Sequence, residues 1–258
     1  MVGRLLLGKP GFQLLDVNDE FVELKEVYPH LISDGGRNNI CLIHKDNGDF
    51  NLRINFSKLS VNNKLIIGRK SRLKGVARFN GCDNEFTFIG DSISDFYMVQ
   101  NVNNNKNLLF VGAGSSSNGT TFSLAGNCEI VVGENAMFAN EVFLRASDMH
   151  SILDLDSCRI INESSTHVTL FPNVWLGQDS IVLKGVTIGP GSIVAARAVV
   201  TSSFSSNVLI GGIPAKQLKE RVFWTRQLNP TEKQISATKE QISSYAEQYL
   251  QIVENAKN

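Results

Sequence analysis

The chain has 258 residues, with 25 Lys and Arg against 25 Asp and Glu, so its formal net charge is +0. This balance excludes a nucleic-acid-binding protein that relies on overall charge, and 42% hydrophobic residues exclude a disordered chain. No apolar stretch reaches the ~18 to 20 residues that a membrane span needs, and the run Leu5–Leu7 is too short for the core of a secretory signal. We therefore expect a cytoplasmic globular protein with no membrane span and no nucleic-acid partner.

The N-terminal part, residues 1–60, contains two strand-like runs at Ile40–Ile43 and Leu52–Phe56, with acidic, Gly and Asn residues between them. We expect a separate β-rich subdomain here. Such a subdomain would cover the strand edges that the first coil of a solenoid otherwise exposes.

A six-residue period begins at Leu170, where the chain divides into LFPNVW, LGQDSI, VLKGVT, IGPGSI and VAARAV. The first residue of each hexad is aliphatic and the fifth is small or β-branched. A period of six does not follow a 3.6-residue helical turn, and a β-sandwich with alternating strands would not keep it over five units. The same register appears over 132–149 and, more faintly, over 67–78. The pattern predicts a triangular β-solenoid over residues 61–213, with the first residue of each hexad pointing inward.

The register stops at His150 and resumes near Thr169 after a stretch that is not a whole number of hexads. A loop of about residues 150–169 must therefore leave the solenoid, and loops on rigid scaffolds often carry binding or catalytic residues. Beyond the repeats, residues 214–258 are expected to form a helical tail. Pro230 stands at its start and an amphipathic pattern runs through Ile242 and Tyr249.

The four cysteines, Cys41, Cys82, Cys128 and Cys158, are widely spaced and form no CxxC pair. This spacing indicates reduced thiols and gives no sign of a disulfide framework or a zinc site.

The hexads together with SDMHSI (147–152), NVWLG (173–177) and GGIPAK (211–216) resemble the hexapeptide-repeat acyltransferases. Among these, the bacterial polysaccharide and sialic-acid O-acetyltransferases are most similar, and the resemblance covers about residues 130–225. It implies a left-handed parallel β-helix with three hexads per coil, assembled as a homotrimer with active sites between subunits. It also implies acetyl-CoA as donor, a glycan hydroxyl as acceptor, and no metal. The handedness comes from the resemblance, because hexads alone do not fix it.

His150 is the candidate general base, since it lies where the hexad register stops and imidazole titrates near neutral pH. A base of this kind works best when its second ring nitrogen is held by a partner. Asp148, Asp154 and Asp156 are candidates for that partner, although each also suits a turn cap. In an extended backbone, Asp148 and His150 would share one face. His167 is expected to be an ordinary loop residue, with a second active-site group as the alternative.

Trp175 stands at the last position of its hexad and should point away from the core. The resemblance implies that it positions the acetyl donor, with packing against a neighbouring subunit as the alternative. Gly177 is a candidate donor to the oxyanion through its backbone N–H. Groups expected to contact coenzyme A are Ala195, Ala196, Arg197 and Lys216, with Lys219 behind them. Ser202 stands where the family usually has Lys, so one phosphate contact is expected to be missing.

The expected function is thus acetyl-CoA-dependent O-acetylation of a sugar hydroxyl in a bacterial capsule or O-antigen. Three alternatives remain open at this stage: N-acetylation of an amino-sugar nucleotide, a metal site like that of the γ-class carbonic anhydrases, and a solenoid that binds glycan without catalysis. A carbonic-anhydrase-like site needs three histidines, and only His150 and His167 lie in the repeats.

Overall fold

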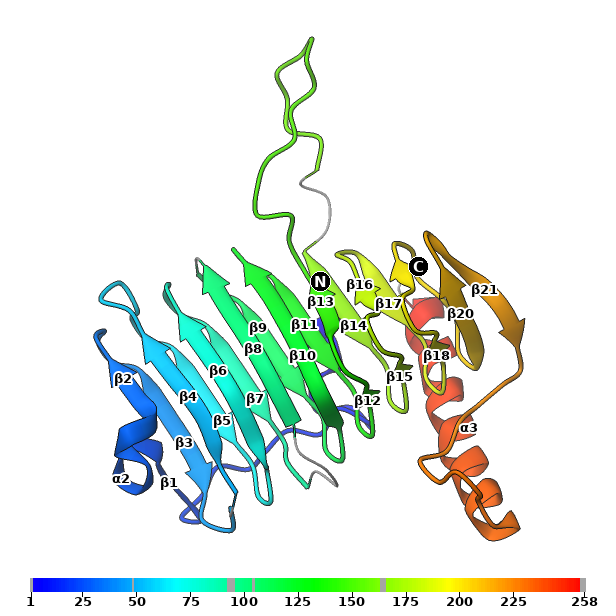
Figure 1. The fold of residues 1–258 in the computed structure, drawn as a ribbon, viewed down its shortest axis with the longest axis horizontal. Coiled ribbons are helices and arrows are strands. Elements are labelled where there is room, and N and C mark those ends of the chain that lie inside the picture. The colour runs from blue at the N-terminus through cyan, green and yellow to red at the C-terminus, as the bar shows by residue number, and fades with distance from the viewer. Residues whose placement is uncertain (1, 48, 92–95, 104, 163–165, 256–258) are drawn as a thin grey trace.

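The computed structural model describes residues 2–47, 49–91, 96–103, 105–162 and 166–255. It is a left-handed parallel β-helix flanked by one long C-terminal helix (Figure 1). The fold class expected from the hexads and from the resemblance is therefore confirmed.

Two sheets run the length of the solenoid, and a third face appears in its C-terminal half. The first sheet contains β1 (Phe21–Glu23), β3 (Ile40–His44), β5 (Lys64–Ile67), β7 (Glu85–Phe88), β9 (Leu108–Val111), β11 (Glu129–Val132), β14 (His167–Leu170) and β17 (Val186–Ile188). The second contains β2 (Ile32–Asp34), β4 (Asn51–Phe56), β6 (Leu73–Phe79), β8 (Phe96–Asn103), β10 (Ser116–Ala125), β12 (Met137–Phe138), β15 (Trp175–Leu176), β18 (Ile193–Val194), β20 (Val208–Gly212) and β21 (Ala215–Glu220). The third face is formed by β13 (Val142–Arg145), β16 (Ile181–Val182) and β19 (Val199–Val200). The helices are α1 (Val2–Leu6), α2 (Leu24–Val27), the 3₁₀ turn Pro29–Leu31 and α3 (Glu232–Asn255).

The coils change shape along the solenoid. In the N-terminal half, Lys64 pairs with Glu85 and Glu85 with Leu108, and each coil has two faces. The strands β5, β7 and β9 of the first sheet have four residues each, and β4, β6 and β8 of the second have six to eight. The ten-residue strand β10 then pairs with β12 through its first half and with β13 through its second half. Beyond this fork the coil has three short faces, and Trp175 pairs with Ile193. These two positions are separated by three whole hexads, the coil length that the resemblance implies.

The boundary expected at residue 60 is wrong. β3 pairs in parallel with β5, and β4 with β6, so the strands before residue 60 belong to the same sheets as the later ones. Among the strands described before residue 60, only β1 runs antiparallel to its neighbour, β3. The hexad pattern could not detect these coils, because the paired positions 32, 54 and 77 are not separated by multiples of six.

The core lies inside the coils, as the hexads predicted. The first residues of the five hexads are all 0% exposed, and so are the small or β-branched fifth residues. These ten residues are Leu170, Val174, Leu176, Ser180, Val182, Val186, Ile188, Ser192, Val194 and Ala198.

A ladder of buried asparagines runs along the corner that precedes the first sheet. Asn63 Nδ2 donates to Asn39 Oδ1 at 2.9 Å, Asn84 Nδ2 to Asn63 Oδ1 at 2.7 Å, and Asn107 Nδ2 to Asn84 Oδ1 at 2.8 Å. Asn107 Oδ1 then accepts from the backbone N–H of Cys128 at 3.0 Å. Each rung satisfies polar groups that the turn would otherwise bury unpaired. The ladder therefore fixes this corner coil by coil.

The outer face of the first sheet is covered by both ends of the chain. Phe12 and Tyr249 pack edge-on against Phe171, and the Arg4 guanidinium lies 3.2 Å from the buried carboxylate of Glu129. Helix α3 begins after a reciprocal cap in which Thr231 N–H donates to Gln234 Oε1 at 2.8 Å. The tail expected to be helical from residue 214 instead starts with β21, which turns back antiparallel on β20.

Among the helices that the structure describes, none is both long and apolar enough to cross a membrane.

Candidate functional site

An insertion interrupts the solenoid between β13 and β14. Met137 pairs with Trp175, and Trp175 pairs with Ile193, so the first of these two coils is more than twice as long as the second. The extra residues lie between Arg145 and His167 and project far from the solenoid (Figure 1). The insertion overlaps the loop expected at about 150–169, and it starts and ends a few residues earlier.

The projecting part is a narrow hairpin. Leu153 and Ile160 form an antiparallel bridge, and Ile161 N–H donates to Ile152 O at 2.8 Å. At the tip, Asp154 accepts from Ser157 N–H at 2.8 Å and from Ser157 Oγ at 2.7 Å. These bonds hold the pKa of Asp154 below its usual value. Asp154 therefore caps a turn, and it is not the partner of His150.

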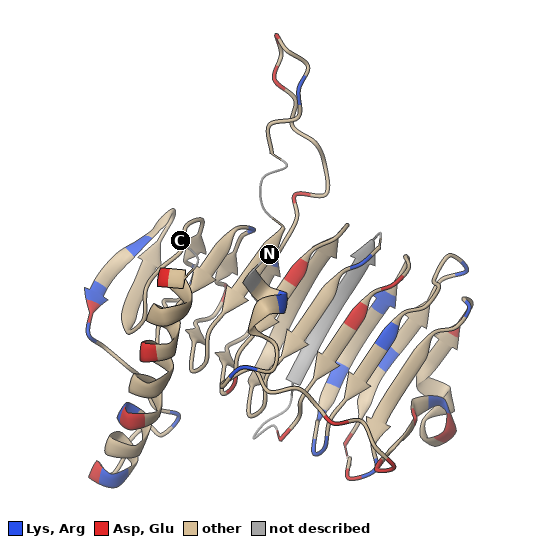
Figure 2. Ribbon diagram, turned by 180° about the vertical axis from the view of Figure 1, so that it is seen from behind, with Lys and Arg blue, Asp and Glu red and all other residues tan. Residues whose placement is uncertain are grey.

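Most of the hairpin is uncharged (Figure 2), and it carries exposed aliphatic side chains. Six large apolar residues between 149 and 161 are 38% to 93% exposed: Met149, Ile152, Leu153, Leu155, Ile160 and Ile161. A patch of this kind on a projecting element is typical of an interaction surface.

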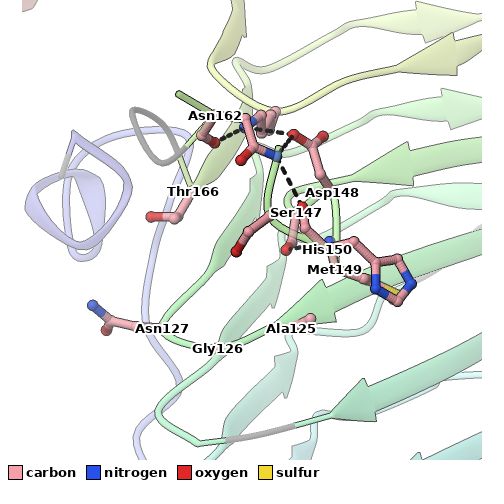
Figure 3. A pocket seen from close by; sticks show the side chains of 11 residues that line it. Ala125, Gly126, Asn127, Ser147, Asp148, Met149, His150, Asn162 and Thr166 are labelled. Carbon is pink, nitrogen blue, oxygen red and sulfur yellow. Dashed lines mark hydrogen bonds and ion pairs between the residues drawn. The ribbon is translucent and has the colours of Figure 1, made fainter. Parts of the chain in front are cut away.

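The base of the hairpin is closed by a polar cluster of Asp148, Asn162 and Lys184. Lys184 Nζ lies 2.8 Å from Asp148 Oδ2 and donates to the backbone oxygen of Asn162. Asn162 Nδ2 donates to Asp148 Oδ2 at 2.8 Å and to His150 O at 2.9 Å (Figure 3). The hydrogen bond from Lys184, followed by that from Asn162, lowers the pKa of Asp148. The two ends of the hairpin are thus tied to the coil below.

A cavity of about 460 Å³ opens at this base. It is lined by residues from three successive coils at the corner where the asparagine ladder ends: Ala125, Gly126, Asn127, Ser147, Asp148, Met149, His150, Ser151, Asn162, Thr166 and Lys184. It is the candidate site because it joins the expected base to an open, polar space of ligand size.

His150 lies in this cavity as an exposed residue, and Asp148 does not orient its ring. Met149 has φ 63°, so the backbone is not extended and the two side chains do not share a face. Figure 3 shows the imidazole turned away from the carboxylate, which is bound to Asn162. The described residues show no hydrogen bond between the His150 ring and Asp148, Asp154 or Asp156. The expected Asp–His pair is therefore wrong.

Replacing Lys184 with Met should loosen the hairpin base. The change removes the largest contribution to the low pKa of Asp148, so this pKa should rise toward its ordinary value of 3.8. Amide hydrogen exchange across 148–162 should become faster, because Asn162 alone then holds the carboxylate. NMR titration and hydrogen exchange measure the two effects.

Arg197→Met is the matched control, since it breaks the surface pair with Asp179 (3.2 Å) and leaves the hairpin untouched. An unchanged Asp148 pKa in Lys184→Met would show that the ion pair does not hold the loop.

Trp175 projects outward from β15 and is half-buried, as its hexad position predicted. Its ring centroid lies 5.9 Å from that of Trp224, whose Nε1 donates to Asn173 O at 2.6 Å. Trp175 does not line the cavity of His150. Within one protomer, these two expected catalytic residues are therefore not brought together.

The residues expected to meet coenzyme A lie elsewhere on the coil. Ala195, Ala196 and Arg197 form the corner between the second and third faces, and Lys216 is exposed on β21. The N–H of Gly177 donates to Val194 O at 2.8 Å and so is not available to an oxyanion. A Cβ at this position would lie 2.6 Å from the backbone nitrogen of Ala196, so glycine is needed there for coil stacking.

His167 is not in a loop but starts β14, where it is half-buried beside Glu129. Burial lowers the pKa of His167 below 6.5, so the unfolded chain takes up this proton at a higher pH than the folded chain does. Stability should therefore fall as pH drops below about 6.5. In His167→Gln the loss between pH 7.5 and 5.5, measured by urea unfolding, should be smaller than in the wild type. An equal loss would show that His167 is not the group responsible.

Sequence reasoning missed Asn162 and Lys184. Lys184 could have been found from the hexad register. If the whole insertion is assigned to one coil, β13 pairs with β16, and Lys184, which follows β16, lies next to the residues that follow β13. Asn162 has no such signal, because the hairpin's own hydrogen bonds decide which residue returns to Asp148.

Comparisons with known proteins agree with this architecture. Residues 167–202 match the family model described as bacterial transferase hexapeptide (six repeats). The polysialic acid O-acetyltransferase of Escherichia coli O1:K1 is 31% identical over 99 residues, covering 38% of this chain and 32% of the relative. The galactoside O-acetyltransferase of Escherichia coli K12 is 29% identical over 93 residues, covering 35% and 44%. The chain thus spans less than half the length of either relative.

Among solved structures, the polySia specific acetyltransferase NeuO superposes with a TM-score of 0.68 at 24% identity, covering 81% of this chain and 97% of that one. This likeness concerns the fold. The resemblance to hexapeptide-repeat acyltransferases that the sequence motifs suggested is confirmed. In the described part of the chain, no three His, Cys, Asp or Glu side chains are grouped to hold a metal ion, so the carbonic-anhydrase-like alternative finds no ligand set there.

Proposed function

We propose that the protein is an acetyl-CoA-dependent O-acetyltransferase that modifies a sugar hydroxyl of a bacterial surface polysaccharide. The observation that carries the proposal is the position of His150. It is exposed at the mouth of a polar cavity, on an insertion that leaves a hexapeptide-repeat solenoid. The names of the relatives, which act on polysialic acid and on galactosides, support a glycan acceptor.

His150 is the general base in this proposal. As the acceptor oxygen attacks the thioester carbonyl, a ring nitrogen of His150 takes the hydroxyl proton and a tetrahedral intermediate forms. Its collapse breaks the carbon–sulfur bond, and the imidazolium returns the proton to the departing thiolate. The products are the acetylated sugar and coenzyme A, and His150 ends in its starting state.

Asp148 acts in this scheme as a positioning residue. Its carboxylate is held by Lys184 and Asn162, and Asn162 in turn binds the backbone oxygen of His150. The cluster therefore fixes the main chain that carries the base and makes no hydrogen bond with the ring. Coenzyme A is expected to lie along the corner of Ala195, Ala196 and Arg197, with Lys216 near its phosphates.

A homotrimer is part of the proposal, and two rows of outward apolar side chains support it. Residues in register on the second sheet form one row, and residues in register on the third face form the other; all are half-buried in one protomer. The rows are Met137, Trp175, Ile193 and Leu209, and Phe143, Ile181 and Val199. An assembly through these faces also accounts for the separation of His150 from Trp175, because a second copy can complete the cavity.

Ile181→Glu should therefore break the assembly. A charge in the middle of an apolar interface lacks a partner and is costly to bury. Multi-angle light scattering should give the wild type three times the mass of the 28.4 kDa chain, and the variant the mass of one chain. Leu250→Glu, on an exposed position of α3, is the control and should remain trimeric. A monomeric wild type, or a trimeric Ile181→Glu, would refute this arrangement.

The decisive experiment incubates the protein with acetyl-CoA and candidate glycans and measures added acetyl groups by mass spectrometry. Parallel acceptors that carry only a hydroxyl or only an amino group separate O-acetylation from N-acetylation of an amino-sugar nucleotide. Acetyl transfer to the amino acceptor alone would overturn the proposal. So would the absence of transfer to any acceptor, together with the absence of coenzyme A binding.

A further inference from the structure

A second cavity, which His150 does not line, lies at the corner between the first and second sheets. It has a volume of about 140 Å³ and is lined by three separate segments. The solenoid corner contributes Asn135 and Asn173, the segment after β21 contributes residues 224–227, and α3 contributes Thr238 and Gln241. The reaction proposed above uses none of these groups.

One residue of the cavity wall, Asn173, is 7% exposed and carries a buried side-chain oxygen, Oδ1, that has no hydrogen-bond partner among the described residues. A buried carboxamide oxygen left unpaired is unfavourable, and a bound molecule that supplies the missing donor is one explanation for it. The backbone of Asn173 is fully engaged, since its N–H donates to Glu134 O at 2.8 Å and its oxygen accepts from Trp224.

The charged group in this lining, Arg226, is already engaged by protein contacts. It donates from Nη1 to Ser116 Oγ at 2.7 Å and from Nη2 to the carbonyl oxygens of Gly114 at 2.9 Å and Ala136 at 3.0 Å. Its guanidinium also stacks 5.8 Å from the centroid of Trp224. Arg226 therefore clamps the covering segment to the solenoid, and the described lining includes no Asp, Glu or Lys.

The remaining lining consists of carboxamides, hydroxyls and one indole. Four residues carry carboxamides, two carry hydroxyls, and Trp224 is a buried part of the wall: Asn135, Asn173, Gln227, Gln241, Thr225, Thr238 and Trp224. Carboxamides both donate and accept hydrogen bonds, as sugar hydroxyls do. The volume is several times the ~30 Å³ of a water molecule and suits one sugar ring.

We propose that this cavity is a binding site for one neutral pyranose unit, distinct from the cavity of His150. Such a site would hold a glycan chain at a distance from the point of reaction. This proposal does not depend on acetyl transfer, so a direct measurement of sugar binding tests it.

The test uses tryptophan fluorescence. The chain has two tryptophans, so Trp175→Phe leaves Trp224 as the single reporter inside the cavity. D-glucose, D-galactose and N-acetyl-D-glucosamine are titrated without acetyl-CoA, alongside N-acetylneuraminic acid and adenosine. We expect a saturable change with at least one of the three neutral sugars. A response confined to the anionic sugar or to adenosine would overturn the proposal, as would no response at all.

Variants then locate the binding. In the same background, Gln241→Leu and Thr238→Val each remove one hydrogen-bonding group and should weaken the sugar about tenfold, which corresponds to ~1.4 kcal/mol. Gln248→Leu is the matched control: like Gln241, it makes only a 3.5 Å bond to a neighbour four residues away on α3, and it lies outside the cavity. Its affinity should be unchanged. Circular dichroism establishes that each variant is folded. Equal affinity in all three variants would refute the assignment.

Adding His150→Ala to the reporter variant separates the two proposals. Sugar binding should be unchanged, because His150 lies in the other cavity. Loss of sugar binding in that variant would mean that the sugar occupies the cavity of His150, and the second site would be refuted while the proposed function stood.

Discussion

His150→Ala should lower acetyl transfer by about 10²- to 10⁴-fold, the usual contribution of a general base. The loss should appear in kcat, because the imidazole acts on the proton that moves in the transition state and contributes little to substrate affinity. Steady-state kinetics with acetyl-CoA and an accepted glycan measure it.

The fold should survive this change. His150 is exposed, and its contact with Asn162 runs through the backbone oxygen, which alanine retains. The melting temperature should therefore stay close to that of the wild type. His30→Ala, which removes an exposed histidine from the 3₁₀ turn near the N-terminus, is the control and should keep full activity. Turnover within a factor of about three of the wild type in His150→Ala would refute the role of His150.

The hexad pattern predicted the C-terminal coils well because it depends only on which residues face inward. A side chain at the first position of a hexad points into the interior of the coil, so Leu170 and Val194 are fully buried as expected. The coils before residue 60 escaped detection because their paired positions, Ile32, Ile54 and Ala77, are 22 and 23 residues apart, which are not multiples of six. Asn63, Asn84 and Asn107 repeat at a similar spacing of 21 and 23 residues, so this asparagine repeat was the sequence pattern that indicated coils in the N-terminal half.

The candidate site was predictable in position but not in its contacts. The break in the hexad register located the insertion and His150. Strand pairing requires a whole number of hexads in each three-faced coil, so residues that break the register must leave the coil. The partner of Asp148 could not be predicted in the same way. A single left-handed residue, Met149, turns the chain between Asp148 and His150, and Lys184 approaches from the next coil. Short-range spacing cannot anticipate a contact that depends on one backbone angle and on a residue from another coil.

The asparagine ladder connects the unrecognised half of the chain to the site. It runs down the corner before the first sheet and ends at the N–H of Cys128. The neighbouring residues Ala125, Gly126 and Asn127 line the cavity of His150. The turns that form one wall of the cavity thus rest on a column of buried amides, and the stability of that column decides the temperature up to which the site keeps its shape.

Asn84→Ala should accordingly lower the free energy of unfolding by about 3 kcal/mol. Asn84 is 0% exposed, and its side chain bonds to Asn63 on one side and to both the N–H and the amide of Asn107 on the other. Alanine removes these side-chain bonds, so the buried N–H and side-chain amide of Asn107 each lose one acceptor at a place that solvent does not reach. Urea unfolding measures the loss.

Asn55→Ala is the control for this prediction, since Asn55 lies on an exposed position of β4, and it should change the free energy of unfolding by less than about 0.5 kcal/mol. Activity of Asn84→Ala at low temperature should match the wild type, because His150, Asp148 and Lys184 are untouched, and it should be lost at a lower temperature on heating. A loss of less than about 1 kcal/mol would mean that water or neighbouring groups satisfy the broken rung, and the ladder would then not be what holds this corner.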